Sequence, residues 1–103
     1  MGNKVQPSPS LDDLRTRRSE ILRLAEQRGA FNVRVFGSVA RGEARVDSDI
    51  DLLVDFQDGA TLWDAVGLWQ DLQEFLGRSV SLITEDNRDT RFIRRVLKEA
   101  VPL

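Results

Sequence analysis

The sequence contains neither cysteine nor histidine among its 103 residues. Their absence excludes disulfide bonds, thiol nucleophiles, ordinary zinc sites and every catalytic triad that uses histidine. No apolar run approaches the roughly 20 residues that a helix needs to cross a bilayer. Residues 1–10 also lack the apolar core of a signal peptide. We therefore expect a cytoplasmic protein that is not inserted in a membrane.

Blocks of positive charge are missing as well. The formal net charge is −2, and no run of lysine or arginine is longer than a pair such as Arg17-Arg18. A protein that binds long nucleic acid usually carries a basic patch, so this charge distribution argues against such a partner. With 41% hydrophobic and 31% charged residues, the chain has the composition of one small globular domain.

Residues 37–56 combine a glycine turn with two carboxylates that are separated by one residue. The apolar residues of this stretch alternate in the pattern of a β-strand: Ile50, Leu52, Val54 and Phe56. Residues two apart in a strand point to the same face, so Asp49 and Asp51 are predicted to lie side by side opposite the apolar row. Two such carboxylates repel each other and need a cation or a proton between them. Oxygen-only ligands favour magnesium or manganese over zinc.

The segment before this strand supplies groups that suit a phosphate. Residues 31–36 form a short β-rich run that ends at Gly37 and Ser38. A strand followed by such a turn and a helix start leaves backbone N–H groups directed at an anion. Ser38 adds a hydroxyl donor, and Arg41 adds a guanidinium group suited to phosphate. Phosphate-binding groups beside metal ligands predict a magnesium–nucleotide site for phosphoryl or nucleotidyl transfer.

These residues carry a resemblance to a known superfamily. Gly37-Ser38, ten intervening residues and Asp49-Ile50-Asp51 match the signature of the DNA polymerase β-like nucleotidyltransferases. From about residue 11 to residue 103, the short chain resembles their minimal nucleotidyltransferase (MNT) branch. The resemblance implies the small palm-like fold of that superfamily.

The resemblance also implies the chemistry and the partners. In the resembled family, metal ions bridge carboxylates and a nucleoside triphosphate. By this likeness, Asp49 and Asp51 would be catalytic residues that hold Mg²⁺ or Mn²⁺, and the ATP phosphates would be held by Gly37, Ser38 and Arg41. MNT antitoxins add AMP to a tyrosine of a HEPN-domain toxin and so silence it. We therefore expect AMP transfer from ATP to a protein hydroxyl, within a hetero-oligomer formed with such a toxin.

One position departs from the family pattern. The third carboxylate of the family lies on the next core strand, between two apolar residues, and here that position is Ser81. A serine hydroxyl is a weak, uncharged ligand and does not act as a base near neutral pH. Glu43 and Asp47, in the connecting segment, are weaker candidates to replace the missing carboxylate. Asp55 shares the parity of the pair but lies too far along the strand.

Three functions are compatible with this departure. The leading hypothesis is the adenylyl-transferring antitoxin, whose activity would be lost when Asp49 and Asp51 are changed to asparagine. The alternative is a catalytically degenerate nucleotide-binding module that neutralises its partner by complex formation, through apolar surface such as Trp63. An aminoglycoside-type enzyme that modifies a small molecule is the weakest hypothesis, because nothing supplies the extra domain that would hold its acceptor.

The remaining sequence predicts an α+β (α/β) fold. Residues 1–10 are expected to form a flexible tail, and residues 11–103 the nucleotidyltransferase domain. Periodicity and capping residues predict helices over 11–28, 61–76 and 89–100, and strands over 31–36, 50–56 and 78–84. This order gives a mixed sheet of about three strands with flanking helices.

The two tryptophans lie on the second of these long helices. Trp69 falls on its apolar face with Leu62 and is expected in the core. Trp63 falls off that face, where it is either covered by a loop or available to a partner.

Overall fold

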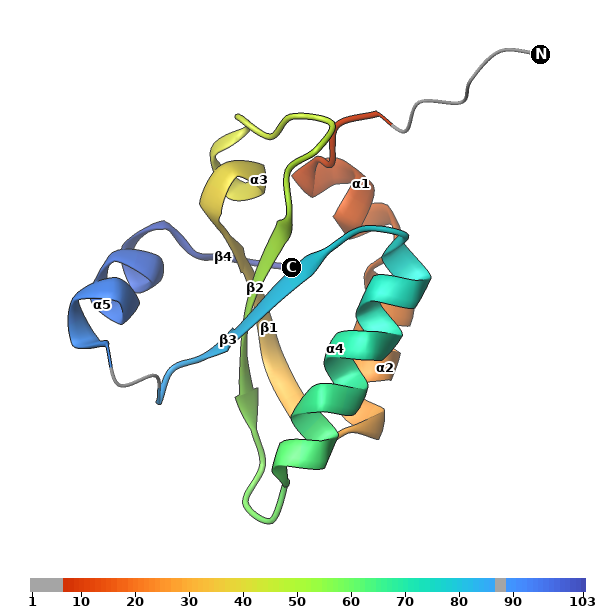
Figure 1. The fold of residues 1–103 in the computed structure, drawn as a ribbon, viewed down its shortest axis with the longest axis vertical. Helices are drawn as coiled ribbons and strands as arrows, with labels where there is room; N and C mark the ends of the chain where they lie inside the picture. The colour runs from red at the N-terminus through yellow and green to blue at the C-terminus, as the bar shows by residue number, and fades with distance from the viewer. Residues whose placement is uncertain (1–6, 87–88) are drawn as a thin grey trace.

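The computed structural model describes residues 7–86 and 89–103. Its centre is a sheet of four strands: β1 (Ala30–Phe36), β2 (Ile50–Phe56), β3 (Val80–Thr84) and β4 (Val101–Pro102). Their order is β3-β2-β1-β4, with β2 and β3 parallel and the other neighbours antiparallel. Helices α2 (Arg18–Gln27) and α4 (Leu62–Leu76) cover one face, and α5 (Thr90–Glu99) covers the other (Figure 1). The predicted mixed sheet with flanking helices is confirmed.

The sequence pattern does not predict the fourth strand. β4 has only two residues, which pair with Arg34 and Val35 of β1. Two residues show no alternation, and Pro102 lacks the N–H that a ladder needs, which confines it to a sheet edge. The short strand still matters, because it ties the end of α5 to β1 and so fixes the position of Glu99.

The predicted helix over residues 11–28 is two helices in the structure. The first, α1 (Leu11–Thr16), begins at Ser10, whose hydroxyl accepts a hydrogen bond from the Asp13 N–H at 3.1 Å. The Thr16 hydroxyl then donates to the Asp13 carbonyl at 2.6 Å. Such back-bonding bends helices, and the chain leaves helical geometry at Arg17 (φ −103°, ψ 13°) before α2 begins. The prediction of one continuous helix is therefore wrong.

The sheet is buried on both faces. The alternating row of β2 packs Ile50, Leu52 and Val54 into the main core below α2 and α4. Leu53 points the other way and forms a smaller core with Phe36 and Val96 of α5. Because α5 covers much of that second face, the carboxylates predicted there lie at its uncovered end rather than along an open strand surface.

The predicted N-terminal cap of α4 is present, but two residues that were predicted to lie on its buried apolar face are exposed. Thr61 and Asp64 form the predicted capping box. Leu62, predicted to be apolar-facing, is 75% exposed, because the first turn of α4 runs past the end of the sheet (Figure 1). Trp63 is 79% exposed, so no loop covers it.

The prediction that Trp69 lies in the core is also wrong. The residue is 40% exposed, and its indole N–H donates to the Val80 carbonyl at 2.7 Å. The side chain lies on the flank of α4 that faces the edge strand β3, one helical step away from the buried Leu68. The amphipathic indole thus sits at the sheet edge, where one end can be apolar and the other bonded.

The beginning of the chain is described only in part. Residues 1–6 of the predicted tail lie outside the described residues. Pro9 is buried, and the carbonyl of Pro7 accepts a hydrogen bond from Arg78. Among the helices that the structure describes, none is both long enough and apolar enough to cross a membrane.

Candidate functional site

The predicted site residues of three strands lie in one row across the sheet. In the register of the sheet, Phe36 of β1 is opposite Asp51 of β2, and Asp51 is opposite Ser81 of β3. Gly37 follows Phe36 directly, so it lies on one side of Asp51 while Ser81 lies on the other. Neighbouring strands are about 4.8 Å apart, so this row is compact. Asp49 precedes β2 and is exposed, whereas Asp51 is half-buried.

Gly37 is required at its position for two reasons. Its φ is +73°, in the left-handed region that L-residues rarely adopt. A Cβ atom built on Gly37 would also lie 2.1 Å from Oδ2 of Asp51. The glycine turn and the second carboxylate are therefore in direct contact, and any side chain at residue 37 would displace Asp51.

Gly37 opens the short helix α3 (Gly37–Arg41), and its amide already has an anionic partner. The Gly37 N–H donates to Oε1 of Glu99 at 2.9 Å. Arg41 donates from Nη1 to Oε2 of the same carboxylate at 2.9 Å, and from Nε to Glu43 at 2.9 Å. The Gly37 amide and the Arg41 guanidinium, both predicted to bind an anion, thus bind the same anion, the carboxylate of Glu99.

Sequence reasoning missed Glu99. It is the last residue of α5, far from the glycine turn in sequence, and belongs to no motif. One local signal could have identified it. A negative charge in the last turn of a helix is repelled by the helix dipole. The charge of Glu99 is therefore unfavourable at this position unless donors outside the helix stabilise it. Gly37 and Arg41 provide that compensation.

The electrostatics of the site favour a cation. Burial raises the pKa of Asp51 above its ordinary value, the charge of Asp49 raises it further, Arg41 lowers it, and Glu99 adds a smaller rise. The raised pKa means that burial and the neighbouring carboxylates disfavour the charged form more than Arg41 favours it, and a bound cation would favour that form. The donor set of Asp49, Asp51 and the Ser81 hydroxyl consists of hard oxygen atoms, which suits Mg²⁺ or Mn²⁺.

Among the described residues, no third carboxylate joins the pair. Glu43 is bound to Arg41, and Asp55 forms an ion pair with Arg34 at 3.1 Å. Asp47 is exposed in the segment before β2. Within residues 7–86 and 89–103, no three acidic side chains come close enough together to hold a metal ion. The serine at residue 81 is therefore not compensated by a neighbour in the described part of the chain.

A groove of about 490 Å³ adjoins the carboxylates. Asp49 and Ser81 line it at the site, and the side chains of α4 and β3 line the remainder: Ala65, Val66, Trp69, Val80 and Leu82. The groove is mostly apolar, with oxygen atoms at the end beside the site. Asp49 also lines a smaller cavity of about 230 Å³, beside residues 77–79.

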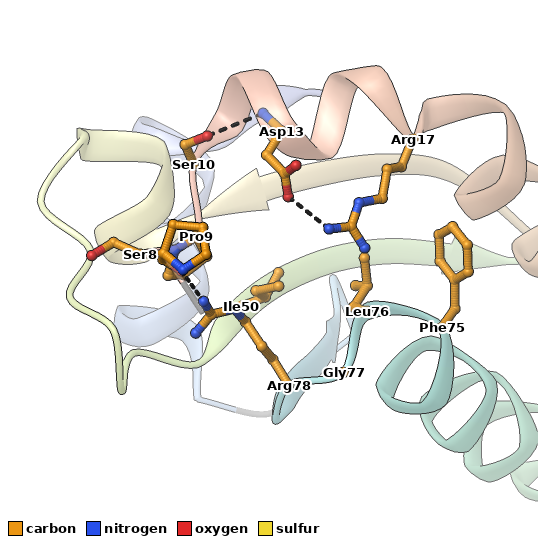
Figure 2. A pocket seen from close by; sticks show the side chains of 11 residues that line it. Ser8, Pro9, Ser10, Asp13, Arg17, Ile50, Phe75, Leu76, Gly77 and Arg78 are labelled. Atoms are coloured by element: carbon orange, nitrogen blue, oxygen red, sulfur yellow. Dashed lines mark hydrogen bonds and ion pairs between the residues drawn. The ribbon is translucent and has the colours of Figure 1, made fainter. Parts of the chain in front are cut away.

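A second cavity, of about 420 Å³, lies where the N-terminal segment meets β2 and the end of α4 (Figure 2). Ile50 lines it, on the strand face opposite Asp51. Asp13 and Arg17 pair across its rim at 3.2 Å, and Arg78 is bound to the chain at Pro7. None of the predicted site residues reaches this cavity, so it is separate from the carboxylate pair.

Comparison with known proteins identifies the family. The profile of the nucleotidyltransferase domain matches residues 18–103. The protein adenylyltransferase MntA of Thermococcus cleftensis is 38% identical over 78 residues, which cover 76% of this chain and 79% of that protein. The chain belongs to the nucleotidyltransferase family. The curated relatives that are 38% identical to this chain are named protein adenylyltransferases. The one from Methanocaldococcus jannaschii aligns over 80% of this chain and 88% of its own length.

Solved structures agree with this assignment. A minimal nucleotidyltransferase is 50% identical to this chain, with a TM-score of 0.81 over 91% of this chain and 96% of that one. A toxin–antitoxin complex solved with AMP-PNP has a TM-score of 0.70 at 23% identity, over 82% of this chain and 69% of that one. The second likeness shows a shared fold. The resemblance to minimal nucleotidyltransferases predicted from Gly37 to Asp51 is confirmed.

Proposed function

We propose that this nucleotidyltransferase transfers AMP from ATP to a hydroxyl of a partner protein, with Mg²⁺ or Mn²⁺ as its metal. The observation that carries the proposal is the row of Gly37, Asp51 and Ser81 across three strands, in which the glycine turn touches the second carboxylate. Phosphate-binding and metal-binding groups within contact of each other suit a metal-bound triphosphate better than either ligand alone.

Each predicted residue has a role in this proposal. The Gly37 N–H, the Ser38 hydroxyl and the Arg41 guanidinium bind the phosphates that leave as pyrophosphate. Asp49 and Asp51 hold the metal ion, which neutralises the charge of the triphosphate during transfer. Glu99 must release Gly37 and Arg41 when phosphates bind, because its carboxylate uses the same donors.

The proposed partner is a HEPN-type toxin, with which the chain would form a hetero-oligomer in the cytoplasm. Support comes from neighbours of the same fold, one of which is an MNT antitoxin in complex with a tri-AMPylated HEPN toxin of Shewanella oneidensis. The exposed Leu62 and Trp63 at the start of α4 provide apolar surface of the kind that anchors protein interfaces.

A second function is favoured by Ser81. With serine at that position and no third acidic side chain beside the pair in the described residues, the chain lacks a carboxylate to activate the acceptor. The protein would then bind nucleotide and neutralise its partner by complex formation alone. This alternative predicts that binding of the partner survives the change of Asp49 and Asp51 to asparagine.

The test uses α-labelled ATP, Mg²⁺ and an extract of the source cells. Wild type, Ser81→Asp and the double variant Asp49→Asn/Asp51→Asn are compared side by side. Label on a protein band with wild type but not with the double variant supports a working transferase. Label only with Ser81→Asp supports the binding alternative, and label that persists in the double variant overturns the proposed site.

A further inference from the structure

The outer face of α5 carries a row of positive charge, which we call the basic stripe. It has four cations, spaced three and four residues apart: Arg91, Arg94, Arg95 and Lys98. This spacing places them on one side of the helix, and all four are exposed. With a rise of about 1.5 Å per residue, the stripe is about 10 Å long. It lies on the sheet face opposite α2 and α4 (Figure 1).

The described part of the chain does not neutralise the basic stripe. None of its four cations forms an ion pair or a side-chain hydrogen bond with a described residue. The one acidic residue of α5, Glu99, is already bound at the glycine turn. Exposed arginines on the other side of the sheet do have partners, since Arg17 pairs with Asp13 and Arg23 pairs with Glu20.

The basic stripe is unfavourable for the helix that carries it. Like charges three or four residues apart on a helix repel each other, and the stripe contains four such pairs. Arg91 also places a positive charge in the first turn, where the helix dipole favours a negative one. The first turn of α5 has no acidic residue that would offset this charge. Uncompensated departures from local stability are expected at functional sites, so a partner that brings negative charge would account for the stripe.

A membrane surface does not fit the basic stripe. A basic helix that lies in a membrane interface inserts its own apolar face among the lipids. In α5 that face is already used, because Ile93 and Val96 are buried in the protein. Phe92 also packs edge-on against Phe36, with 6.2 Å between ring centroids.

Nucleic acid fits the basic stripe less well than protein does. With four cations and one anion, α5 has a net charge of +3, so the rest of the chain has −5 within the total of −2. A phosphate backbone longer than the stripe would therefore continue over a surface that carries excess negative charge. The aromatic ring of α5 is that of Phe92, which packs against Phe36 and so is not free to stack on bases.

The composition of the surface suits a protein partner. Three of the four cations are arginines, which are enriched at protein interfaces, whereas lysine is depleted there. Leu97 is 45% exposed and lies on the flank of the stripe, one helical step from Arg94. An apolar side chain beside arginines can be covered by a protein surface that also supplies carboxylates.

We propose that the basic stripe of α5 docks an acidic helix of the partner protein, whose carboxylates pair with the four cations while Leu97 lies at the edge of the contact. The inference rests on the proposed function only in requiring a partner protein, and it holds whether or not AMP is transferred. The stripe ends one residue before Glu99, which binds the Gly37 amide. A partner docked there lies beside the proposed phosphate-binding turn.

The test uses a capped synthetic peptide of about 15 residues, a length at which an alanine-rich helix can form. Its four glutamates have the spacing of the basic stripe on an alanine and glutamine background, and a scrambled peptide of the same composition is the control. Each is titrated into the complete isotope-labelled protein at low salt and followed by NMR. The expected result is a saturable shift of the α5 amides, with about three- to tenfold tighter binding of the patterned peptide. Added salt is expected to weaken it.

Paired variants locate the contact. Arg94→Gln/Arg95→Gln is expected to bind the patterned peptide about three- to tenfold more weakly, whereas Arg94→Lys/Arg95→Lys retains most of the binding because the charges remain. Arg18→Gln/Arg23→Gln removes the same charge from α2 and is expected to change the binding little. Thermal unfolding is expected to show that Arg94→Gln/Arg95→Gln is at least as stable as wild type, because repulsion within α5 falls. Equal losses of binding in the two glutamine variants would mean that only net charge matters, which overturns the inference.

Two further probes distinguish the other classes of partner. A uridine pentanucleotide has four phosphodiester charges and so matches the four glutamates of the peptide. If it shifts the α5 amides at lower concentration than the patterned peptide does, the inference fails in favour of RNA. Cosedimentation with phosphatidylserine vesicles that depends on Arg94 and Arg95 also overturns it. So does a patterned peptide that leaves the α5 amides unshifted.

The same spectra separate this inference from the proposed function. Binding of Mg²⁺ and AMP-PNP is expected to shift the backbone amides of Gly37 and Ser38. If those amides do not respond while α5 binds the patterned peptide, the proposed nucleotide site fails and the docking surface stands. If they respond and α5 ignores the peptide, only the docking surface fails.

Discussion

The carboxylate of Glu99 accepts a hydrogen bond from the backbone N–H of Gly37 at 2.9 Å. The same carboxylate is bound by Arg41 at 2.9 Å. Two donors that suit a phosphate are thus occupied by a side chain from the far end of the sequence. Because a carboxylate and a phosphate compete for the same donors, Glu99 is expected to weaken nucleotide binding.

The first prediction concerns Glu99→Gln. Glutamine has nearly the same shape but no charge, so its bonds to Gly37 and Arg41 are weaker than charge-assisted ones. The affinity for Mg²⁺-bound AMP-PNP is expected to rise about three- to tenfold. Isothermal titration calorimetry measures this change directly.

Glu85→Gln is the matched control for this variant. Glu85 pairs with Arg34 at 3.2 Å, just past the end of β3 that lies away from Ser81. Its change is expected to leave nucleotide affinity unaltered. A loss of affinity in Glu99→Gln would contradict the competition and would instead make Glu99 part of the ligand-binding set.

The second prediction separates two kinds of strain at glycine. Gly37 and Gly42 both have a φ of +73°, but only Gly37 has a neighbour, Oδ2 of Asp51, where a Cβ would lie. Gly42→Ala is expected to lower the free energy of unfolding by about 1 kcal/mol. Gly37→Ala is expected to lower it by about 3 kcal/mol or more, since the clash adds to the backbone strain. Urea denaturation measures both, and equal losses would contradict the close contact.

The third prediction concerns the missing carboxylate. Ser81 lies beside Asp51 in the register of the two strands, so Ser81→Asp places a third carboxylate next to the pair. Mg²⁺ affinity is expected to rise about tenfold, because a charged ligand replaces a weak neutral one. Gln57→Asp, an exposed position just past the other end of β2, adds the same charge and is expected to change the affinity little. Equal gains in the two variants would mean that only net charge matters.

The fourth prediction concerns pH. Burial and the charge of Asp49 raise the pKa of Asp51 in the folded protein. The folded state therefore disfavours the ionised form of Asp51 relative to the unfolded state. The free energy of unfolding therefore falls as the pH rises through this raised pKa. Asp51→Asn, which cannot ionise, is expected to be more stable than wild type at pH 7. This advantage should vanish below about pH 3.9, the ordinary pKa of aspartate.

Thermal unfolding across this pH range checks the sign. Asp58→Asn removes an equivalent charge from an exposed loop and serves as the control, with little expected change. An advantage of Asp51→Asn that is the same at acidic and neutral pH would contradict a charge-based origin.

Local patterns in the sequence were sufficient for the elements and the motif. Alternation predicted β2, because a strand that packs one row into a core shows period two. The capping box of Thr61 and Asp64 predicted the start of α4, because that bond forms between residues three apart. The glycine turn and the two aspartates were found for the same reason, since their chemistry depends on spacing within one short stretch.

Patterns failed where a side chain's environment depends on distant segments. The periodicity of α4 predicted Trp69 as core, but periodicity gives a direction around the helix and not what lies there. In the structure, the Trp69 side chain lies beside the edge strand β3 instead of against the face of the sheet. The break at Arg17 was missed because a threonine hydroxyl can bond to the backbone one turn earlier, as Thr16 does to Asp13, and apolar periodicity does not register such a bond.

The fold class, the family and the carboxylate pair could be predicted from the amino-acid sequence, because their signals lie between residues that are close along the chain. The groups that surround the pair could not be predicted, because they come from distant segments. The register of three strands places Ser81 and Gly37 on either side of Asp51. The short strand β4 brings Glu99 onto the glycine turn. Contacts of this kind join residues far apart in sequence, and they form only when the sheet and α5 pack together.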